Sequence, residues 1–154
     1  MIPKSRDMER IAIFPGSFNP FTRGHQSIVD RGLALFDKII IAFGENYDKC
    51  DSEKMAENIE KVKALYCKNE RVGVVSYTGL TVELARSVGA KFILRGVRNV
   101  ADFEYERNMA DINRKIASIE TILLFAEPEM AMISSSVVRE LAHYGYNVNE
   151  MLPE

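Results

Sequence analysis

Short, continuous runs of apolar residues alternate along the chain with segments in which apolar residues recur at helical spacing. A continuous apolar run is typical of a parallel strand covered on both faces, and such runs predict strands at residues 11–14, 37–43, 71–77, 91–96 and 120–126. The helical spacing predicts helices at residues 28–36, 55–65, 81–89, 101–117 and 134–145. Because strand and helix alternate with short connections, we expect an α/β fold, with residues 1–154 forming a single domain around a doubly wound, five-stranded parallel sheet.

Capping residues indicate where several of these helices begin and end. Thr22 and Ser52 are expected N-caps, because a hydroxyl oxygen accepts hydrogen bonds from the unpaired N–H groups of a first turn. Gly89 and Gly145 are expected to end the third and fifth helices, since glycine readily adopts the left-handed conformation that terminates many helices.

Three unusual segments follow predicted strands. They are "PGSFNPFTRGH" after the first strand, "RGVRN" after the fourth and "EPEMAMISSS" after the fifth. In open parallel sheets, ligands bind outside the carboxyl ends of the strands, where the strand order reverses. The topology alone therefore predicts a binding site at this edge of the sheet.

The first of these segments carries the features of an anion site. Gly16 can adopt backbone angles closed to other residues and lets the chain approach a ligand closely, and Ser17 adds a hydroxyl. A cap at Thr22 would place Gly24 and His25 in a first helical turn, where unpaired N–H groups favour an anion. His25 could donate a hydrogen bond to a phosphate oxygen. The alternative interpretation is a tight turn with a histidine that only caps the helix.

The other two segments add positive charge and hydroxyl groups. Arg95 and Arg98 suit phosphate, because the guanidinium group donates paired hydrogen bonds. The alternative is that they form structural ion pairs with Asp102 or Glu104. The serine run 134–136 could bind phosphate at a helix N-terminus, since capping requires only one hydroxyl.

The sequence contains no paired carboxylates, Cys/His dyad, metal-ligand cluster or G-x-x-x-x-G-K-[ST] motif. Lys49, in the polar segment 44–52, is by itself typical of solvated surface. The sequence therefore indicates phosphate-binding groups without an enzymic nucleophile.

Composition excludes several classes of protein. The chain has 154 residues, 47% of them hydrophobic, and a formal charge of −2, which disfavours nucleic acid as a partner. Its two cysteines fit neither a disulfide framework nor a zinc site. No apolar stretch reaches membrane-spanning length, and the N-terminus is too polar for a signal peptide, so we expect a cytoplasmic protein without membrane partners.

Three motifs of the chain resemble those of a known family. "PGSFNPFTRGH" resembles the T/S-x-G-H signature of the nucleotidylyltransferase superfamily, and "LRGVRNVADFEYERNMADINRKI" and "ISSSVVRE" are similar to the phosphopantetheine adenylyltransferase family. The resemblance covers nearly the whole chain and implies a Rossmann-like nucleotidylyltransferase fold. The implied reaction transfers the adenylyl group of ATP to 4′-phosphopantetheine, an intermediate of coenzyme A synthesis, and releases pyrophosphate.

The resemblance also implies roles for individual residues. The expected catalytic residues are His25, as a transition-state stabiliser, Lys49 and Arg98. The acceptor is expected to contact Ser17, Lys49, Thr81 and Arg95. ATP is expected to contact Ser17, Phe18, His25, Gly96, Val97, Arg98, Glu106, Met130, Ala131, Met132, Ile133, Ser134, Ser135 and Ser136.

Further implications are a homohexamer, Mg²⁺ as cofactor, and coenzyme A as a candidate feedback ligand. An acceptor phosphate is already charged and needs no general base, which accounts for the absence of a nucleophile. The departures from the family pattern include Asn19, which replaces a usual Asp, and Met130, which replaces a residue that is often aromatic. The segment "DKCDSEKMAEN", which contains Lys49, also differs from the usual Lys-rich loop. The alternatives are a nucleotidylyltransferase with another nucleotide or acceptor, and a non-catalytic nucleotide-binding module.

Overall fold

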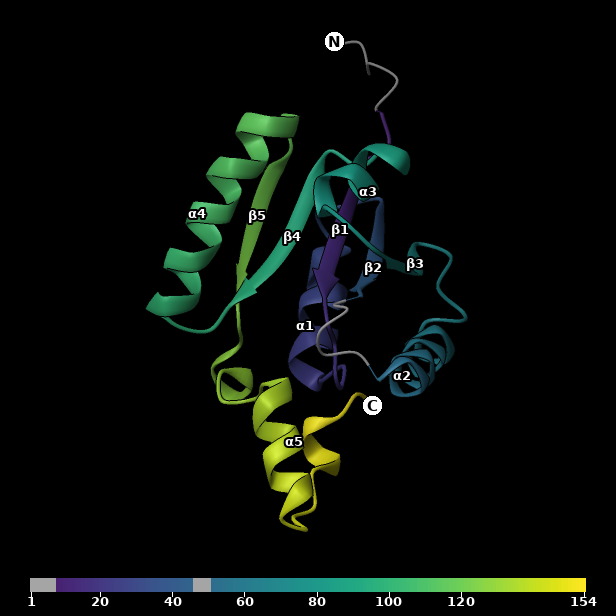
Figure 1. Cartoon of the computed structure of the whole chain (residues 1–154), viewed down its shortest axis with the longest axis vertical. Helices are drawn as coiled ribbons and strands as arrows, with labels where there is room; N and C mark the ends of the chain where they lie inside the picture. The colour runs from purple at the N-terminus through teal and green to yellow at the C-terminus, as the bar shows by residue number, and fades with distance from the viewer. Residues whose placement is uncertain (1–7, 46–50) are drawn as a thin grey trace.

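The computed structural model describes residues 8–45 and 51–154. Its centre is a five-stranded sheet in the order β3-β2-β1-β4-β5, in which every neighbouring pair is parallel (Figure 1). The sheet confirms the predicted fold class. The strands are β1 (Ile11–Gly16), β2 (Lys38–Gly44), β3 (Val72–Tyr77), β4 (Phe92–Val97) and β5 (Glu120–Phe125).

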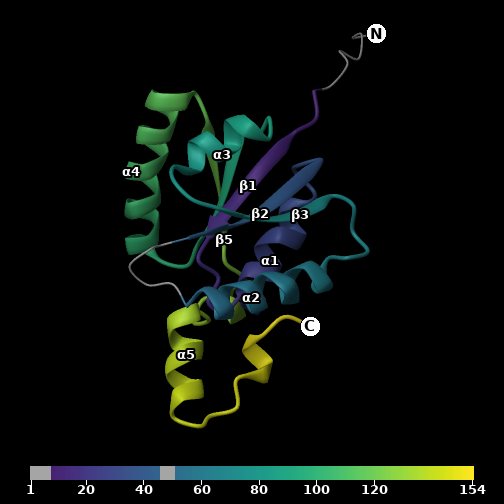
Figure 2. The ribbon, with the colours of Figure 1, turned by 45° about the vertical axis from the view of Figure 1, so that its right-hand side comes forward.

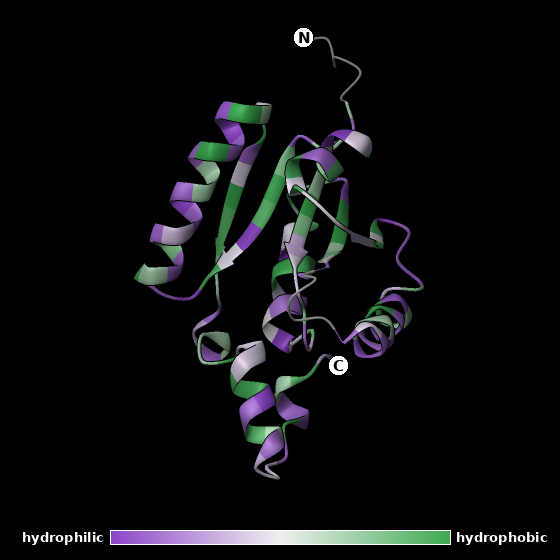
Figure 3. Cartoon of the chain, in the orientation of Figure 1, coloured by the Kyte–Doolittle hydropathy of each residue, from purple (hydrophilic) through white to green (hydrophobic). Residues whose placement is uncertain are grey.

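Helices cover both faces of this sheet, and each face has its own hydrophobic cluster. One cluster joins α1 and α2 to the sheet through residues such as Val29, Val62 and Ile41. The other joins α3 and the end of α4 to the opposite face through residues such as Val82, Ile93 and Ala117. Figure 3 shows the hydrophobic residues concentrated along the strands, as burial on both faces requires. The helices are α1 (Arg23–Gly32), α2 (Ser52–Leu65), α3 (Thr81–Ser87), α4 (Val100–Ala117) and α5 (Ser135–His143), with short 3-10 turns at Pro128–Met130 and Asn149–Met151.

Two local predictions were wrong. Asp51, not Ser52, caps α2, and its carboxylate accepts hydrogen bonds from the N–H groups of Glu53 and Lys54. The first helix ends at Gly32, so Phe36 lies in the following turn, although its ring is buried as the apolar pattern suggested. The caps at Thr22 and Ser134 and the left-handed glycines at positions 89 and 145 are as predicted.

Helix α5 stands apart from the two layers. Figures 1 and 2 show it beyond the carboxyl ends of the strands, together with the last residues of the chain. Val138 is its one buried residue. In the described parts of the chain, no helix is long and apolar enough to cross a membrane.

Candidate active site

Two cavities adjoin at the carboxyl edge of the sheet. The larger has a volume of about 470 Å³ and the smaller about 190 Å³. Binding sites for small ligands commonly have roughly 300–1,000 Å³. The two cavities share a wall, so ligands bound in both would lie next to the same residues. The shared residues are Pro15, Gly16, Ser17, Arg95, Tyr105 and Glu106.

The structure brings together most of the site residues predicted from the sequence. Ser17, Thr81 and Arg95, the described members of the predicted acceptor set, all line the smaller cavity. Lys49 lies outside the described residues. Three of the expected ATP contacts, Val97, Ala131 and Met132, do not line the larger cavity. Val97 is buried, and Met132 is 84% exposed. The predicted residues that line the larger cavity are Ser17, Phe18, His25, Arg95, Gly96, Arg98, Glu106, Met130, Ile133, Ser134, Ser135 and Ser136.

The turn after β1 differs from its prediction in one respect. Among the residues of this turn, the one with a positive φ is Phe18, at 45°, whereas Gly16 has ordinary backbone angles. Gly16 is required by space, because a Cβ atom there would lie 2.9 Å from the ring of Phe18. Asn19 follows, and its side-chain oxygen accepts a hydrogen bond from Asn58 of α2 at 3.4 Å. The turn is thus held by its own packing and by a neighbouring helix.

His25 forms the helix cap that the alternative interpretation of the sequence named. The ring nitrogen Nδ1 of His25 accepts a hydrogen bond from the backbone N–H of Thr22 at 2.9 Å. The backbone N–H of His25 in turn donates to the Thr22 hydroxyl at 3.3 Å. This reciprocal pair is a capping box at the start of α1. Because a backbone N–H can only donate, Nδ1 must be the unprotonated nitrogen. The proton is therefore on Nε2, which remains available as a donor.

The environment of His25 keeps its ring neutral. The ring centroid lies 5.0 Å from that of Phe18, 5.3 Å from that of Phe21 and 6.2 Å from that of Phe14. Burial among these rings, together with the positive charges of Arg95 and Arg98, lowers the pKa of His25 from 6.5 to about 4. At neutral pH the side chain is consequently a neutral hydrogen-bond donor beside the larger cavity.

Arg95 lies within β4 and forms an ion pair across the wall between the two cavities. Its Nη2 lies 2.7 Å from a carboxylate oxygen of Glu106, and its Nη1 donates to the carbonyl of Pro15. Glu106 is only 5% exposed, and a buried carboxylate requires a partner such as this arginine. The predicted alternative of a structural ion pair therefore holds for Arg95, but with Glu106 instead of Asp102 or Glu104. Arg95 still lines both cavities.

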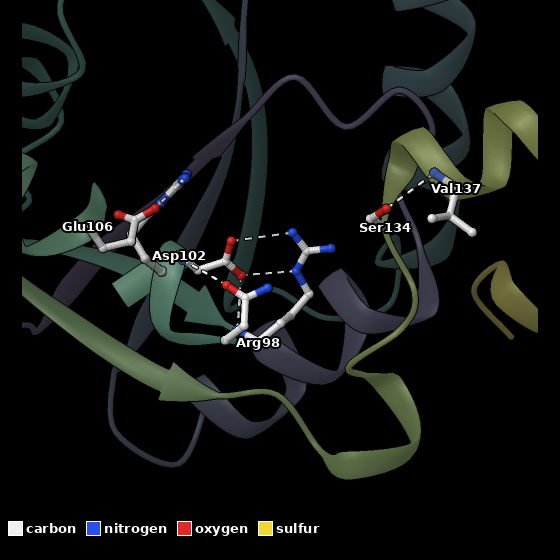
Figure 4. Close-up of polar contacts among 7 residues, drawn as sticks. Arg98, Asp102, Glu106, Ser134 and Val137 are labelled. Carbon is white, nitrogen blue, oxygen red and sulfur yellow. Dashed lines mark hydrogen bonds and ion pairs between the residues drawn. The ribbon is translucent and has the colours of Figure 1, made fainter. Parts of the chain in front are cut away.

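Arg98 forms the ion pair that the alternative interpretation named. Its Nε lies 3.1 Å from Asp102, whose carboxylate also accepts the backbone N–H of Arg98 (Figure 4). The pair is partly exposed, and such pairs contribute only about 0–1 kcal/mol. An anion entering the larger cavity could therefore compete with Asp102 for this guanidinium group at small cost.

The three serines at the start of α5 differ in function. Ser134 caps the helix, and its hydroxyl accepts the N–H of Val137 at 3.2 Å (Figure 4). Ser135 donates to the carbonyl of Pro20 at 2.8 Å. Ser136 also lines the larger cavity, and its hydroxyl makes no hydrogen bond to the described residues. Capping thus uses one hydroxyl, as predicted, and a second one attaches the helix to the turn after β1.

The smaller cavity contains residues that the sequence analysis missed. Tyr105, Met109 and Asn113 line it from successive turns of α4, and their four-residue spacing would have placed them on one helical face. Tyr77, from the end of β3, hydrogen-bonds to Thr81 at 2.7 Å. This cavity therefore has a mixed polar and apolar lining suited to an elongated organic group.

The described residues contain no group of three or more His, Cys, Asp or Glu side chains that could hold a metal ion. Mg²⁺ commonly binds through substrate phosphates, several waters and only one or two carboxylates. A magnesium ion at this site would therefore have to be held mainly by a nucleotide.

Comparisons with known proteins show the family to which the chain belongs. Residues 13–141 match the family described as Cytidylyltransferase-like. The phosphopantetheine adenylyltransferase of Bacteroides thetaiotaomicron is 50% identical over 145 residues, which cover 94% of this chain and 96% of the relative. That of Porphyromonas gingivalis is 46% identical over 146 residues, or 95% of each chain.

Solved structures support the fold. A Vibrio parahaemolyticus protein, proposed to be a nicotinate-nucleotide adenylyltransferase, superposes with a TM-score of 0.68 at 19% identity, covering 96% of this chain and 95% of the other. A bifunctional NMN adenylyltransferase/ADP ribose pyrophosphatase from Francisella tularensis also has a TM-score of 0.68, at 16% identity, covering 94% of this chain and 45% of the other. At these identities the likeness concerns the fold alone.

Proposed function

The chain belongs to the phosphopantetheine adenylyltransferase family, and on this basis we propose that it transfers the adenylyl group of ATP to 4′-phosphopantetheine. The products are dephospho-coenzyme A and pyrophosphate. The observation that carries this proposal is the pair of adjoining cavities with a common wall at Ser17 and Arg95. Transfer between two substrates requires such an arrangement, because the reacting phosphates must meet.

We assign ATP to the larger cavity and the acceptor to the smaller one. An oxygen of the acceptor phosphate attacks the α-phosphorus of ATP, a new P–O bond forms, and the bond to the leaving pyrophosphate breaks. Negative charge is redistributed over the α-phosphate and the leaving group in the transition state. No proton has to be removed from the acceptor phosphate, so the chemistry needs donors and positive charge instead of a base.

His25 supplies such a donor. The capping hydrogen bond at Nδ1 orients the ring and leaves Nε2–H to stabilise a phosphate oxygen. Its low pKa keeps it neutral, so it does not act as an acid or base near pH 7. Arg98 and Lys49 are proposed to add positive charge on the ATP side and the acceptor side, respectively. Arg95, which is held by Glu106, is proposed to bind the acceptor phosphate.

Mg²⁺ is the proposed cofactor, held mainly by the ATP phosphates. When bound, it would neutralise part of the phosphate charge. Coenzyme A is a proposed feedback ligand, since it carries both halves of the reaction product. We also propose that the protein is cytoplasmic.

A homohexamer is the proposed assembly. Support comes from the apolar side chains that α4 leaves exposed at helical spacing, namely Tyr105, Met109, Ile112 and Ile116. A continuous exposed apolar stripe of this kind is typical of a protein–protein contact. Sedimentation of the purified protein should give a mass near six chains, and substitution of Ile112 and Ile116 by Lys should lower it.

The activity is tested by pyrophosphate release. We expect release from ATP with 4′-phosphopantetheine, and little with CTP or with nicotinamide mononucleotide as acceptor. Preference for CTP or for another acceptor would indicate a different nucleotidylyltransferase. ATP binding without turnover on any acceptor would indicate a non-catalytic nucleotide-binding module.

A further inference from the structure

Two side chains of α5 hold adjacent carbonyl groups of the turn after β1. Ser135 Oγ donates to the carbonyl of Pro20 at 2.8 Å, and Arg139 Nη1 donates to the carbonyl of Asn19 at 2.5 Å. Ser135 and Arg139 are one helical turn apart and therefore point in the same direction from α5. In the part of the chain that the structure describes, the two carbonyls accept no other hydrogen bond.

These contacts matter because α5 has little other attachment. Val138 is its one buried residue, and the helix lies beyond the edge of the sheet (Figure 2). The segment that follows α5 reaches α1 through Glu154, which forms an ion pair with Arg23 and two hydrogen bonds with Gln26, but the glutamate side chain is 80% exposed. Exposed pairs fix orientation weakly. Ser135 and Arg139, the latter itself exposed, supply the hydrogen bonds that join α5 directly to the turn.

Both ends of this connection adjoin residues that line the larger cavity. On one side, Asn19 and Pro20 lie between Phe18, which packs against His25, and Thr22, which forms the capping box with His25. On the other side, the N-terminus of α5 presents Ser134 and Ser136 to the same cavity. A shift of α5 against the turn would change the spacing between the serine N–H groups and the His25 ring.

We propose that Arg139 is a positioning residue of the transferase reaction, which acts with Ser135 to keep the N-terminus of α5 in register with His25. Arg139 does not line either cavity and acts through the groups that do. Its effect is expected mainly on the nucleotide and its departing phosphates, because α5 lines the larger cavity and not the acceptor cavity. The proposal rests on the proposed function for its kinetic consequence, but the connection itself can be tested without turnover.

The kinetic test compares Arg139→Met with Arg139→Lys, which keeps one donor. Loss of one charge-assisted hydrogen bond corresponds to about a tenfold effect. For Arg139→Met we expect kcat/KM for ATP to fall about tenfold, with the acceptor KM within about twofold of wild type. Arg139→Lys should recover part of the loss. Arg107→Met is the matched control, because Arg107 is an exposed arginine of α4 that lines neither cavity.

The second readout is amide hydrogen exchange of residues 17–25 in the free protein. Exchange in this segment should accelerate in Arg139→Met and stay unchanged in Arg107→Met. If exchange accelerated in Arg139→Met but the wild-type protein had no transferase activity, the proposed function would be overturned and the connection between α5 and the turn would be retained. Unchanged exchange and unchanged ATP kinetics in Arg139→Met would overturn the positioning role. An equal rise in KM for both substrates would overturn it as well.

Discussion

His25 is the residue whose substitution separates catalysis most clearly from local structure. His25→Ala removes three things at once, namely the acceptor for the Thr22 N–H, the Nε2 donor, and a ring packed against three phenylalanines. Loss of the cap costs about 1 kcal/mol. The space left by the ring adds about 2 kcal/mol or more. We therefore expect His25→Ala to melt about 6–12 °C below wild type, at about 2–4 °C per kcal/mol.

The catalytic loss is expected on top of this. Removing one donor to a developing charge lowers kcat by about 10²–10³. His25→Gln distinguishes the two effects, because glutamine is the usual residue of a capping box and its amide also keeps a donor. We expect a melting temperature within a few degrees of wild type and partial activity. Thr22→Val is the matched control, since it weakens the cap but leaves the imidazole in place.

The assay is steady-state pyrophosphate release at saturating ATP, well below each variant's melting temperature, with calorimetry of each variant. If His25→Ala turned over at the wild-type rate while melting lower, His25 would be a cap only. If Thr22→Val lost as much kcat as His25→Ala, the loss would come from the helix terminus instead of the Nε2 donor. Either result would refute the reasoning.

Three further predictions concern charge. The pKa of His25 is about 4 in the folded protein and 6.5 in the unfolded chain, so the stability that neutral His25 supports is fully present above pH 6.5. Urea unfolding should show that up to about 3 kcal/mol of stability is lost as pH falls from 6.5 to 4. The loss should be smaller in His25→Gln. Because His25 stays neutral near pH 7, the pH profile of kcat should have the same shape near pH 6.5 in the wild type and in His25→Gln. Arg95→Ala should lower stability by about 3 kcal/mol in urea unfolding, because it leaves Glu106 unpaired. It should also raise the acceptor KM more than the ATP KM. Adding Glu106→Gln should restore stability but not the acceptor KM. Asp102→Asn should change stability by less than about 1 kcal/mol and lower the ATP KM severalfold in steady-state assays by releasing Arg98.

Local chemistry explains what could be predicted from the sequence. The apolar runs determine the strands, because a strand buried on both faces must be apolar throughout. The Thr22 cap and the left-handed Gly89 follow from backbone geometry within one turn. Even the cap of α2 was missed by only one residue, since Asp51 and Ser52 are both good N-caps.

Contacts between residues distant in sequence could not be predicted in this way. The sequence placed Arg95 and Glu106 on different substrates, whereas the fold makes them one ion pair in the wall between two cavities. Nothing near Arg139 indicates that it reaches the carbonyl of a residue 120 positions earlier. Hydrogen bonds within one turn are dictated by the local backbone, but the side chains that meet across the sheet edge are selected by how helices pack on it. The sequence alone therefore determined the elements and the edge where the site lies, and the tertiary structure decided which side chains share that site.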